Sequence, residues 1–489
     1  MKYILAVDQG TTGSRAVLYD RRGQAVVSAY EEFPQHFPRP GWVEHDPEEI
    51  WRSVRRTIQK TLARVPGSSI LAIGIANQRE TTVIWDRETG RPVHNAIVWQ
   101  CRRTADHCRR LNAERGTAAF VRRRTGLPID AYFSATKAEW ILKRIGRRGN
   151  VGAGLCFGNT DAWLLWKLTG GKSHATDPTN ASRTMLFDID AKAWDDELCG
   201  LFGVPRAILP EVLPSSGEFG RTVGIGRLPA GIPIMGMAGD QQAALFGQAG
   251  FGSGAIKNTY GTGCFILMNT GRKRVDSKHG LITTLACGPG GKTAYALEGS
   301  VFVAGAAIQW LRDQLGILKT ADESEAVAEA IEDNSGVYFV PAFVGLGAPH
   351  WNASARGTIV GLTRGSGRAH LVRAALESMA YSTRDVLETM RRDSGLKIRD
   401  LRIDGGAAAN GFLCRFLADI LGIPVIRPRT IETTSLGAAY LAGLAAGFWK
   451  DTAEIERLWA VDEEFAPFMG RRRAEALYRG WKAAVARAI

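Results

Sequence analysis

The chain has 489 residues, of which 45% are hydrophobic, so it is long enough for two domains that each bury an apolar core. Its 62 Lys and Arg residues outnumber its 49 Asp and Glu residues, but the arginines are spread in small groups without interleaved aromatic residues. This spacing is typical of solvated helix faces and argues against a nucleic-acid-binding tail. The seven cysteines form no C-x-x-C pair, which argues against a zinc site or a disulfide framework.

The start of the chain and its most apolar stretch both argue against membrane insertion. An apolar segment follows Met1 almost directly, without the charged region, apolar core and cleavage site of a signal peptide. Residues 436–449 form the longest run of small and apolar residues, but three glycines interrupt the run and it is too short to cross a bilayer. We therefore expect a buried helix there, and a cytoplasmic protein.

The first predicted elements are two strands joined by a turn of glycine and threonine. Gly10 and Gly13 allow the backbone of this turn to approach an anion closely. The hydroxyls of Thr11 and Thr12 add donors for phosphate oxygens, and Asp8 at the strand end is suited to hold Mg²⁺ through water. The alternative interpretation is an ordinary polar hairpin with a capping aspartate.

A helix and a buried strand follow. Asp46 and Pro47 have the residue types of a helix N-cap and a first helical position, and apolar residues at three-to-four spacing continue to Val65. Residues 70–76 are apolar almost throughout, as expected for a strand that is covered on both faces of its sheet. These elements predict an α/β domain.

Polar residues follow this strand, at the place where open α/β sheets bind their ligands. Arg79 can donate hydrogen bonds to the oxygens of a polyhydroxylated substrate, and Glu80 can accept them from its hydroxyls. A local ion pair that closes a turn is an equally good interpretation of these two residues. Further along, Trp99 is suited to cover the carbon side of a small polyol and Tyr132 to add a hydroxyl, although either could simply pack in the core.

Asp240 lies at a predicted junction between a strand and a helix. A short apolar strand, residues 234–238, precedes it, and residues 243–246 begin an apolar helix. At such a junction Asp240 is either a carboxylate general base that faces the binding crevice or the N-cap of the helix.

The pattern of glycine-rich turns returns twice in the second half of the chain. Residues 255–268 again predict a strand, a turn and a strand, and residues 401–410 predict a strand whose glycine-rich tip leads into a helix at 411–421. Glycines in that tip would let a base or ribose lie against the backbone, and Asn410 could hydrogen-bond it. Two related halves, each opening with a phosphate-binding hairpin, are the simplest explanation.

The order of the three turns, Asp-x-Gly-Thr-Thr, Gly-Thr-Gly and Asp-Gly-Gly-x-x-x-Asn, resembles that of the ATPase superfamily of actin, chaperones and sugar kinases. Residues 132–144 and 357–377 are similar to the signatures of the FGGY carbohydrate kinases within it, except that Ala138 stands where a larger apolar residue is usual. The resemblance extends over essentially the whole chain. It implies two ribonuclease-H-like α/β domains that close on a central cleft, which we place at 1–250 and 251–489.

Motifs within residues 41–47, 77–82, 99–104, 239–248 and 258–265 are similar to those of family members that phosphorylate glycerol. The resemblance therefore implies an enzyme that uses ATP and Mg²⁺ to convert glycerol to sn-glycerol 3-phosphate. Its partners would be glycerol and ATP, not nucleic acid. A homo-oligomer, either a dimer or a tetramer, is also implied.

The resemblance further implies roles for individual residues. Glycerol would be bound by Arg79, Glu80, Trp99, Tyr132, Asp240, Gln241 and Phe265. The transferred phosphate and the nucleotide would be bound by Thr11, Thr12, Gly13, Arg15, Thr262, Gly305, Gln309, Gly406 and Asn410. Asp240 would be the general base, and Asp8 would link the protein to Mg²⁺.

Two features depart from the family pattern. Gly13 stands where many members that act on glycerol carry Ser, which removes a hydroxyl but keeps the backbone donor. Residues 226–233 lack the glycine-rich, arginine-ending loop that binds fructose 1,6-bisphosphate in some members, so inhibition by this sugar is not implied.

Two other functions fit part of the sequence. An FGGY kinase for another polyol or for a pentulose would share the nucleotide turns and differ at the substrate residues. A switch ATPase of the actin or chaperone kind would need no hydroxyl-binding cluster beside Asp240.

Overall fold

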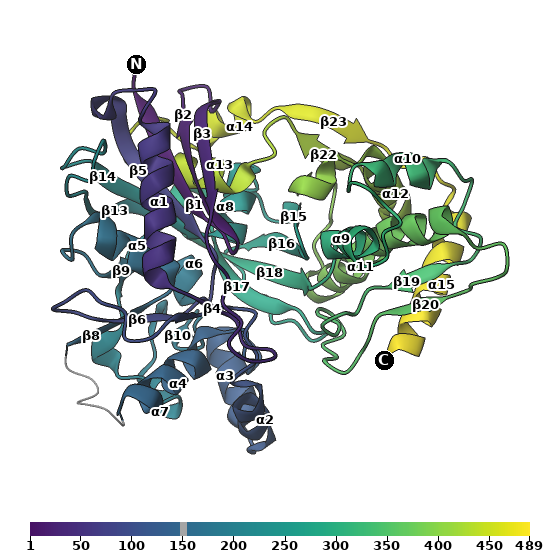
Figure 1. The fold of residues 1–489 in the computed structure, drawn as a ribbon, viewed down its shortest axis with the longest axis horizontal. Helices are drawn as coiled ribbons and strands as arrows, with labels where there is room; N and C mark the ends of the chain where they lie inside the picture. Colours follow the sequence, from purple (N-terminus) through teal and green to yellow (C-terminus); the bar gives the residue numbers. More distant parts are fainter. Residues whose placement is uncertain (147–153) are drawn as a thin grey trace. The chain divides into compact units, whose positions relative to one another are not determined.

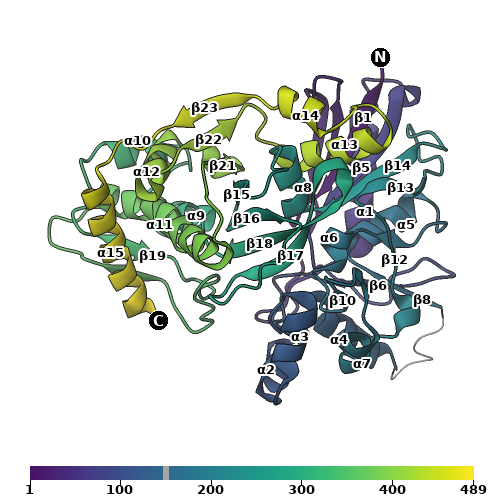
Figure 2. The same cartoon turned by 180° about the vertical axis from the view of Figure 1, so that it is seen from behind.

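The computed structural model describes residues 1–146 and 154–489, which form two compact α/β units (Figure 1; Figure 2 shows the reverse side). Unit 1 consists of Met1–Phe251, Thr283–Tyr295 and Thr433–Leu458, and unit 2 consists of Gly252–Ile282, Ala296–Glu432 and Trp459–Ile489. The expected domains, 1–250 and 251–489, differ from these units in two segments that come late in the chain but fold with unit 1. One of them contains helix α13 (Thr433–Ala445), which packs against the sheet of unit 1.

Unit 1 is built on a six-stranded sheet in the order β13-β14-β5-β1-β2-β3. Its strands are β1 (Tyr3–Gln9), β2 (Gly13–Tyr19), β3 (Ala25–Glu32), β5 (Ile70–Asn77), β13 (Ser216–Arg221) and β14 (Pro233–Gly239). Strand β1 pairs antiparallel with β2 and parallel with β5, which in turn pairs parallel with β14. The predicted hairpin and buried strand are thus confirmed, and β1, β5 and β14 all end at the same edge of the sheet.

Helix α1 (Pro47–Thr61) packs against β2 and β3 and begins as predicted. Asp46 is its N-cap, and Oδ1 of Asp46 accepts a hydrogen bond from the backbone N–H of Glu48 at 2.8 Å. The other helices of unit 1 are α2 (Ala105–Ala113), α3 (Thr117–Thr125), α4 (Ser134–Gly146), α5 (Thr160–Leu168), α6 (Pro178–Ala181), α7 (Asp196–Leu201), α8 (Asp240–Gly247) and α14 (Thr452–Leu458). Short strands complete it: β4 (Glu44–His45), β6 (Val83–Asp86), β7 (Ala96–Ile97), β8 (Leu155–Gly158), β9 (Ala175–Thr176), β10 (Phe187–Asp188), β11 (Ala193–Trp194) and β12 (Glu211–Val212).

The second sheet has seven strands in the order β17-β18-β16-β15-β21-β22-β23. They are β15 (Ile256–Tyr260), β16 (Cys264–Gly271), β17 (Ile282–Cys287), β18 (Thr293–Val301), β21 (Leu401–Asp404), β22 (Val425–Pro428) and β23 (Val461–Phe465). Most of β17 and the start of β18 belong to the segment Thr283–Tyr295 of unit 1. Unit 2 also contains α9 (Gly305–Asp313), α10 (Glu323–Glu329), β19 (Tyr338–Val340), β20 (Thr358–Val360), α11 (Arg368–Ser394), α12 (Gly411–Leu421) and α15 (Arg471–Ala488). Strands β15, β16 and β21 and helix α12 confirm the predicted second hairpin and third turn.

The two sheets share a common core topology. The order β18-β16-β15-β21-β22 repeats the order β3-β2-β1-β5-β14, and β21 pairs parallel with both β15 and β22, as β5 does with β1 and β14. The expectation of two related halves, drawn from the repeated turns, agrees with this shared order.

The charged C-terminal region contains one strand. β23 lies between helices α14 and α15 in the chain and pairs antiparallel with β22 at the edge of the sheet. The guanidinium of Arg427 on β22 forms ion pairs with Asp462 and Glu463 at 2.8 Å each. Pairing with a neighbouring strand therefore stabilises a sequence that has little strand propensity of its own.

Helix α13 packs very closely against α8 and β5 because glycines lie at these contacts. A Cβ on Gly437 would lie 1.8 Å from the carbonyl oxygen of Ala243 in α8, and a Cβ on Gly74 in β5 would lie 2.1 Å from that of Ala438. The expected buried helix at 436–449 is thus present, but it ends at Ala445. Across residues 1–146 and 154–489, the helices lack the combination of length and apolar character that crossing a membrane requires.

We predict that Gly437→Ala destabilises the protein by about 3 kcal/mol, since the new methyl group would push α13 away from α8. Chemical denaturation of the purified variant measures this change. Gly470→Ala is the control, because Gly470 has φ −59° and a Cβ there would meet nothing within 4 Å. Equal stability of both variants would show that α13 and α8 do not pack this closely.

A buried carboxyl group in helix α5 makes stability depend on pH. The side chain of Asp161 is fully buried and accepts a hydrogen bond from the hydroxyl of Thr176, while its Oδ1 has no hydrogen-bond partner in the described part of the chain. Burial raises the pKa of Asp161 to about 7. Between its unfolded pKa and this value the folded protein binds the extra proton, so raising the pH through that window lowers stability.

Asp161→Asn should remove this pH-dependent contribution to stability, because an amide mimics the protonated carboxyl. We expect the variant to gain stability relative to the wild type as the pH rises from 4.5 to 7, by up to about 1.4 kcal/mol per pH unit. Urea denaturation at several pH values measures the difference. Asp106→Asn, which changes an exposed residue, is the control and should follow the wild-type pH dependence. If the free energies of unfolding of Asp161→Asn and wild type differed by the same amount at every pH, that result would contradict the shifted pKa.

Candidate active site

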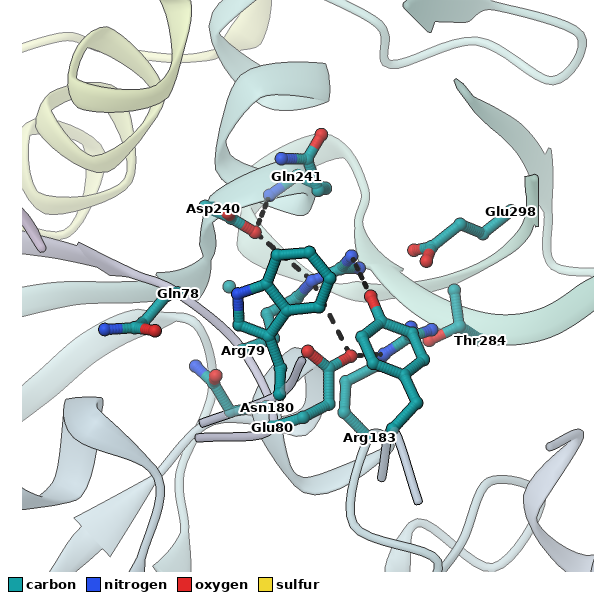
Figure 3. A network of polar contacts seen from close by, with 12 residues as sticks. Gln78, Arg79, Glu80, Asn180, Arg183, Asp240, Gln241, Thr284 and Glu298 are labelled. Carbon is teal, nitrogen blue, oxygen red and sulfur yellow. Dashed lines mark hydrogen bonds and ion pairs between the residues drawn. The ribbon is translucent and has the colours of Figure 1, made fainter. Parts of the chain in front are cut away.

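The polar residues predicted to bind the substrate emerge from two neighbouring strands. Asn77 at the end of β5 is the register partner of Gly239 at the end of β14. Because these strands are parallel, the residues that follow them, Arg79 and Glu80 on one side and Asp240 on the other, leave the sheet together (Figure 3). The structure thus brings Asp240 next to Arg79 and Glu80, which precede it by 161 and 160 positions in the chain.

Arg79 is the centre of this cluster. Its side chain is 2% exposed, and its guanidinium lies between two acceptors from α8: Nε is 3.2 Å from Oδ1 of Asp240, and Nη1 donates to Oε1 of Gln242 at 3.2 Å. Nη2 donates to the hydroxyl of Tyr132 at 3.4 Å. A Cβ on Gly239 would lie 2.6 Å from Cδ of Arg79, so glycine at this position makes room for the arginine.

Glu80 adopts a conformation that is unusual for its residue type. Its φ of 60° lies in the left-handed region, which costs a residue with a Cβ about 1–2 kcal/mol. Buried donors stabilise this turn: the carbonyl oxygen of Glu80 accepts from Nζ of Lys137 at 3.0 Å and from the hydroxyl of Ser134 at 3.2 Å. Its carboxylate accepts from Nε of Arg183 at 2.5 Å.

Lys137 and Arg183 are both fully buried, which makes them unusual among charged side chains. Nζ of Lys137 also donates to the carbonyl oxygen of Tyr132 at 2.6 Å, and burial lowers the pKa of this lysine to about 8. The guanidinium of Arg183 lies 5.6 Å from the ring centre of Tyr132 and 5.3 Å from that of Phe133. Both cations therefore hold groups of the candidate site in place.

Two aromatic residues lie beside the polar cluster. The rings of Trp99 and Tyr132 meet edge to face with centres 5.6 Å apart. Nε1 of Trp99 donates to the hydroxyl of Thr11 at 2.9 Å, which connects this aromatic pair to the first glycine-threonine turn. Trp99 is partly buried and Tyr132 is 5% exposed. Both side chains therefore pack mostly in the protein interior, beside the polar groups.

Asp240 differs from its neighbours in its accessibility. It is the first residue of α8, and Gly239 holds the N-cap position, so Asp240 does not serve as the N-cap considered in the sequence analysis. Its side chain is 28% exposed, whereas those of Arg79 and Glu80 are 2% exposed. Its carboxylate accepts from the adjacent N–H of Gln241 at 2.7 Å. Among these groups Asp240 is the one placed to exchange a proton with a bound molecule.

The first turn closes with a hydrogen bond from the N–H of Gly10 to the carbonyl oxygen of Gly13, at 2.9 Å. Thr12 is exposed, as a ligand-binding turn requires. A Cβ on Gly13 would lie 2.5 Å from the hydroxyl oxygen of Tyr30, so the tyrosine ring occupies the space in which a side chain at position 13 would stand. The guanidinium of Arg15 lies 5.5 Å from the centre of this ring.

Asp8 lies near the end of β1, directly opposite Arg15 on β2, and is partly buried. Within the described ranges, no group of three or more Asp, Glu, His or Cys residues is placed to hold a metal ion. A single carboxylate is still compatible with Mg²⁺, because this ion usually keeps several waters and takes its other ligands from substrate phosphates.

The expected nucleotide residues lie in unit 2, at the ends of the neighbouring parallel strands β15 and β21 and on helix α9. The carbonyl oxygen of Thr262 accepts from the N–H groups of Ala304 and Ala306, at 2.8 and 3.0 Å, at the start of α9. Gly305 packs there so closely that a Cβ would lie 2.6 Å from the carbonyl oxygen of Gly261. Gln309 is exposed one turn further along α9.

The third turn lies next to the second. A Cβ on Gly405, which has φ 84°, would lie 2.2 Å from the carbonyl oxygen of Tyr260, and Gly406 faces open space. Asn410 is the N-cap of α12: its Oδ1 accepts from the N–H of Leu413 at 2.9 Å, and its Nδ2 donates to the hydroxyl of Ser324 at 3.2 Å. Phe265 lies on β16 and is partly buried.

The sequence analysis did not single out Lys137, Arg183 or Gln242. Each acts through a contact with a residue far away in the chain, and such a contact leaves no local pattern. A weak signal existed for Arg183, since residues 176–184 include seven polar or charged side chains, Thr176, Asp177, Thr179, Asn180, Ser182, Arg183 and Thr184. All seven are buried, which the sequence alone does not reveal.

Comparison with known proteins identifies the family. Residues 3–247 match the N-terminal domain and residues 256–446 the C-terminal domain of the FGGY family of carbohydrate kinases. Glycerol kinase 2 of Thermotoga maritima is 57% identical over 493 residues, which cover 100% of this chain and 99% of the relative. The glycerol kinase of Symbiobacterium thermophilum is 59% identical over 490 residues, with coverage of 99% and 98%.

Solved structures agree with this assignment. The crystal structure of Plasmodium falciparum glycerol kinase with ADP is similar at a TM-score of 0.90 and 36% identity, covering 100% of this chain and 98% of that one. A xylulose kinase from Lactobacillus acidophilus has a TM-score of 0.87 at 24% identity, with coverage of 99% and 97%, and shares the fold. Both halves of the chain and its full-length relatives therefore lead to one conclusion: the chain belongs to the FGGY family of carbohydrate kinases.

Proposed function

We propose that this protein transfers the γ-phosphoryl group of ATP to a terminal hydroxyl of glycerol, giving sn-glycerol 3-phosphate and ADP. The observation that carries the proposal is the partly exposed carboxylate of Asp240 beside the buried ion-paired residues Arg79 and Glu80. A small polyol needs donors and acceptors for its hydroxyls, and a phosphoryl transfer to one of them needs a proton acceptor. The relatives that are 57% and 59% identical over their full length are named glycerol kinases, which supports the same substrate.

Glycerol would bind to the cluster in unit 1. The guanidinium of Arg79 donates to a hydroxyl oxygen, and the carboxylate of Glu80 accepts from a neighbouring hydroxyl. Trp99 covers the carbon chain and limits the size of the acceptor, because a site with no room for extra carbons excludes sugars. Tyr132 adds its hydroxyl to the groups that bind the acceptor. Gln241 and Phe265 complete the set of residues that we assign to glycerol.

Asp240 would act as the general base. Its carboxylate accepts the proton of the terminal hydroxyl while that oxygen forms a bond to the γ-phosphorus, and the bond between this phosphorus and the bridging oxygen of ADP breaks. Asp240 then releases its proton to solvent as the product leaves. The ion pair with Arg79, at 3.2 Å between Nε and Oδ1, holds the carboxylate of Asp240 in one orientation.

The glycine-rich turns would bind ATP. In unit 1, Thr11, Thr12 and Arg15 and the backbone N–H of Gly13 are assigned to the transferred phosphate. In unit 2, the nucleotide is assigned to Thr262, Gly305, Gln309, Gly406 and Asn410. Asp8 would hold Mg²⁺ through water; when bound with ATP, this ion neutralises charge on the phosphates.

Replacing Asp240 by Asn should lower kcat by a factor on the order of 10² to 10⁴ while leaving ATP affinity close to wild type. The amide oxygen can still accept from Arg79, but it cannot take up a proton at neutral pH. ADP release with Mg²⁺, ATP and glycerol measures turnover, and calorimetric titration with ATP measures binding. Near-normal turnover in Asp240→Asn would remove this residue from the role of general base.

A control variant and a panel of acceptors accompany this test. Asp106→Asn changes an exposed carboxylate on helix α2, with 74% of its side chain accessible, and should leave turnover unchanged. A panel of polyols and ketoses tests the substrate: preference for a pentulose would replace glycerol but keep the family, and ADP release that needs no acceptor would favour a switch ATPase.

A further inference from the structure

A short buried segment, residues 177–183, contacts both strand ends that carry the candidate site. It contains helix α6 (Pro178–Ala181) and is preceded by β9. The side chains of Asp177, Thr179, Asn180 and Arg183 in this segment are all 0% exposed. Most polar side chains this deeply buried are hydrogen-bonded, so their partners indicate what the segment does.

The first partner is the backbone directly before Asp240. The hydroxyl oxygen of Thr179 accepts from the N–H of Gly239 at 2.9 Å, and the hydroxyl donates to the carboxylate of Asp177 at 2.8 Å. That carboxylate is itself held by the hydroxyl of Ser215 at 2.7 Å and by the N–H of Asn180 at 3.0 Å. Gly239 is thus fixed through Thr179 to the anchored carboxyl group of Asp177, and Asp240 is the next residue.

The second partner is the end of β5. The side-chain amides of Asn180 and Asn77 exchange two hydrogen bonds of 3.0 Å each, and Nδ2 of Asn180 also donates to Asp177 at 2.9 Å. Asn77 precedes Arg79 by two residues. The segment therefore holds both strand ends through one buried network.

The third partner is a substrate residue itself. Nε of Arg183 donates to the carboxylate of Glu80 at 2.5 Å, and the guanidinium lies over the rings of Tyr132 and Phe133. Glu80 has φ 60°, a strained conformation for its residue type. The orientation of its carboxylate therefore depends on contacts with groups outside its own turn. Arg183 supplies such a contact.

We propose that residues 177–183 are the positioning element of the acceptor site: Thr179 sets the direction of Asp240, and Arg183 sets that of Glu80. The inference rests on the proposed function, since it explains how a polyol and its base are aligned. Neither residue needs to touch the acceptor. Misplacing the base should slow the chemical step, whereas misplacing Glu80 should weaken acceptor recognition.

Thr179→Val and Thr179→Ser form a matched pair for the first half of the proposal. Valine keeps the shape but removes the hydroxyl, so we expect kcat to fall by a factor on the order of 10 to 100 with the KM for ATP unchanged. Serine keeps the hydroxyl and should restore kcat to within about threefold of wild type. Steady-state kinetics are run well below each variant's melting temperature, which is measured separately.

Thr57→Val is the control for losing a buried hydroxyl elsewhere. Thr57 is 0% exposed, and its hydroxyl donates to the carbonyl oxygen of Val54 within helix α1 at 2.9 Å. The Thr57→Val variant should keep the wild-type kcat. Wild-type turnover in Thr179→Val, no recovery in Thr179→Ser, or an equal loss in Thr57→Val would each overturn the role of Thr179.

Arg183→Lys tests the second half. Lysine keeps the charge but cannot reproduce a planar guanidinium over two rings. We expect the KM for glycerol to rise by a factor on the order of 10, and the preference for glycerol over propane-1,2-diol, which lacks one hydroxyl, to fall. An unchanged preference would overturn the role of Arg183.

All variants are assayed with the acceptor that the wild type uses best, chosen from a panel of polyols and ketoses. If that acceptor is not glycerol, the proposed substrate fails while the variants still test the positioning element. If the wild type discriminates among acceptors and neither Thr179→Val nor Arg183→Lys alters turnover or preference, the positioning element fails while the proposed function stands.

Discussion

The buried guanidinium of Arg79 is the constraint on which the candidate site depends. A charge that is 2% exposed must be paired and hydrogen-bonded, or it destabilises the fold by several kcal/mol. Its partners include Asp240 and Gln242 at the start of α8, Tyr132 just before α4, and the neighbouring Glu80. Glycine at position 239 follows from the same need, because any side chain there would overlap the arginine. The stability of the fold and the geometry of the candidate site thus make the same demands on these residues.

Glu80 shows how the surrounding structure supports a strained residue. A left-handed conformation is unfavourable for glutamate, and it persists because Lys137 and Arg183 donate to its carbonyl and carboxylate groups. Both donors are fully buried cations, which are costly unless they are well paired. Burying these two cations costs free energy, and their contacts fix the direction of one carboxylate. Such an arrangement is expected where an acceptor must be aligned to within a fraction of an ångström.

Glycine has a second role away from the site. Helix α13 approaches α8 and the strands β5 and β14 through Gly437, Gly74 and Gly236, where an added Cβ would lie between 1.8 and 2.5 Å from a backbone atom. Helix α8 carries Asp240 at its first position, and β5 leads to Arg79. Close backbone packing behind the site therefore limits how far these residues can move.

Local chemistry in the sequence determined the elements and the candidate residues. The Asp46-Pro47 start predicted α1, and turns of glycine and threonine between apolar runs predicted both hairpins. The position after a strand expected to be buried made Arg79 and Glu80 candidate binding residues, with a local ion pair as the alternative. These features depend on neighbours within a few residues. Only the tertiary structure showed that Arg183 reaches Glu80 across 103 positions, that Thr179 fixes Gly239 across 60, and that β23 pairs at a sheet edge. Such contacts arise because folding brings distant segments within 3 Å, and no local pattern of residue types records that distance.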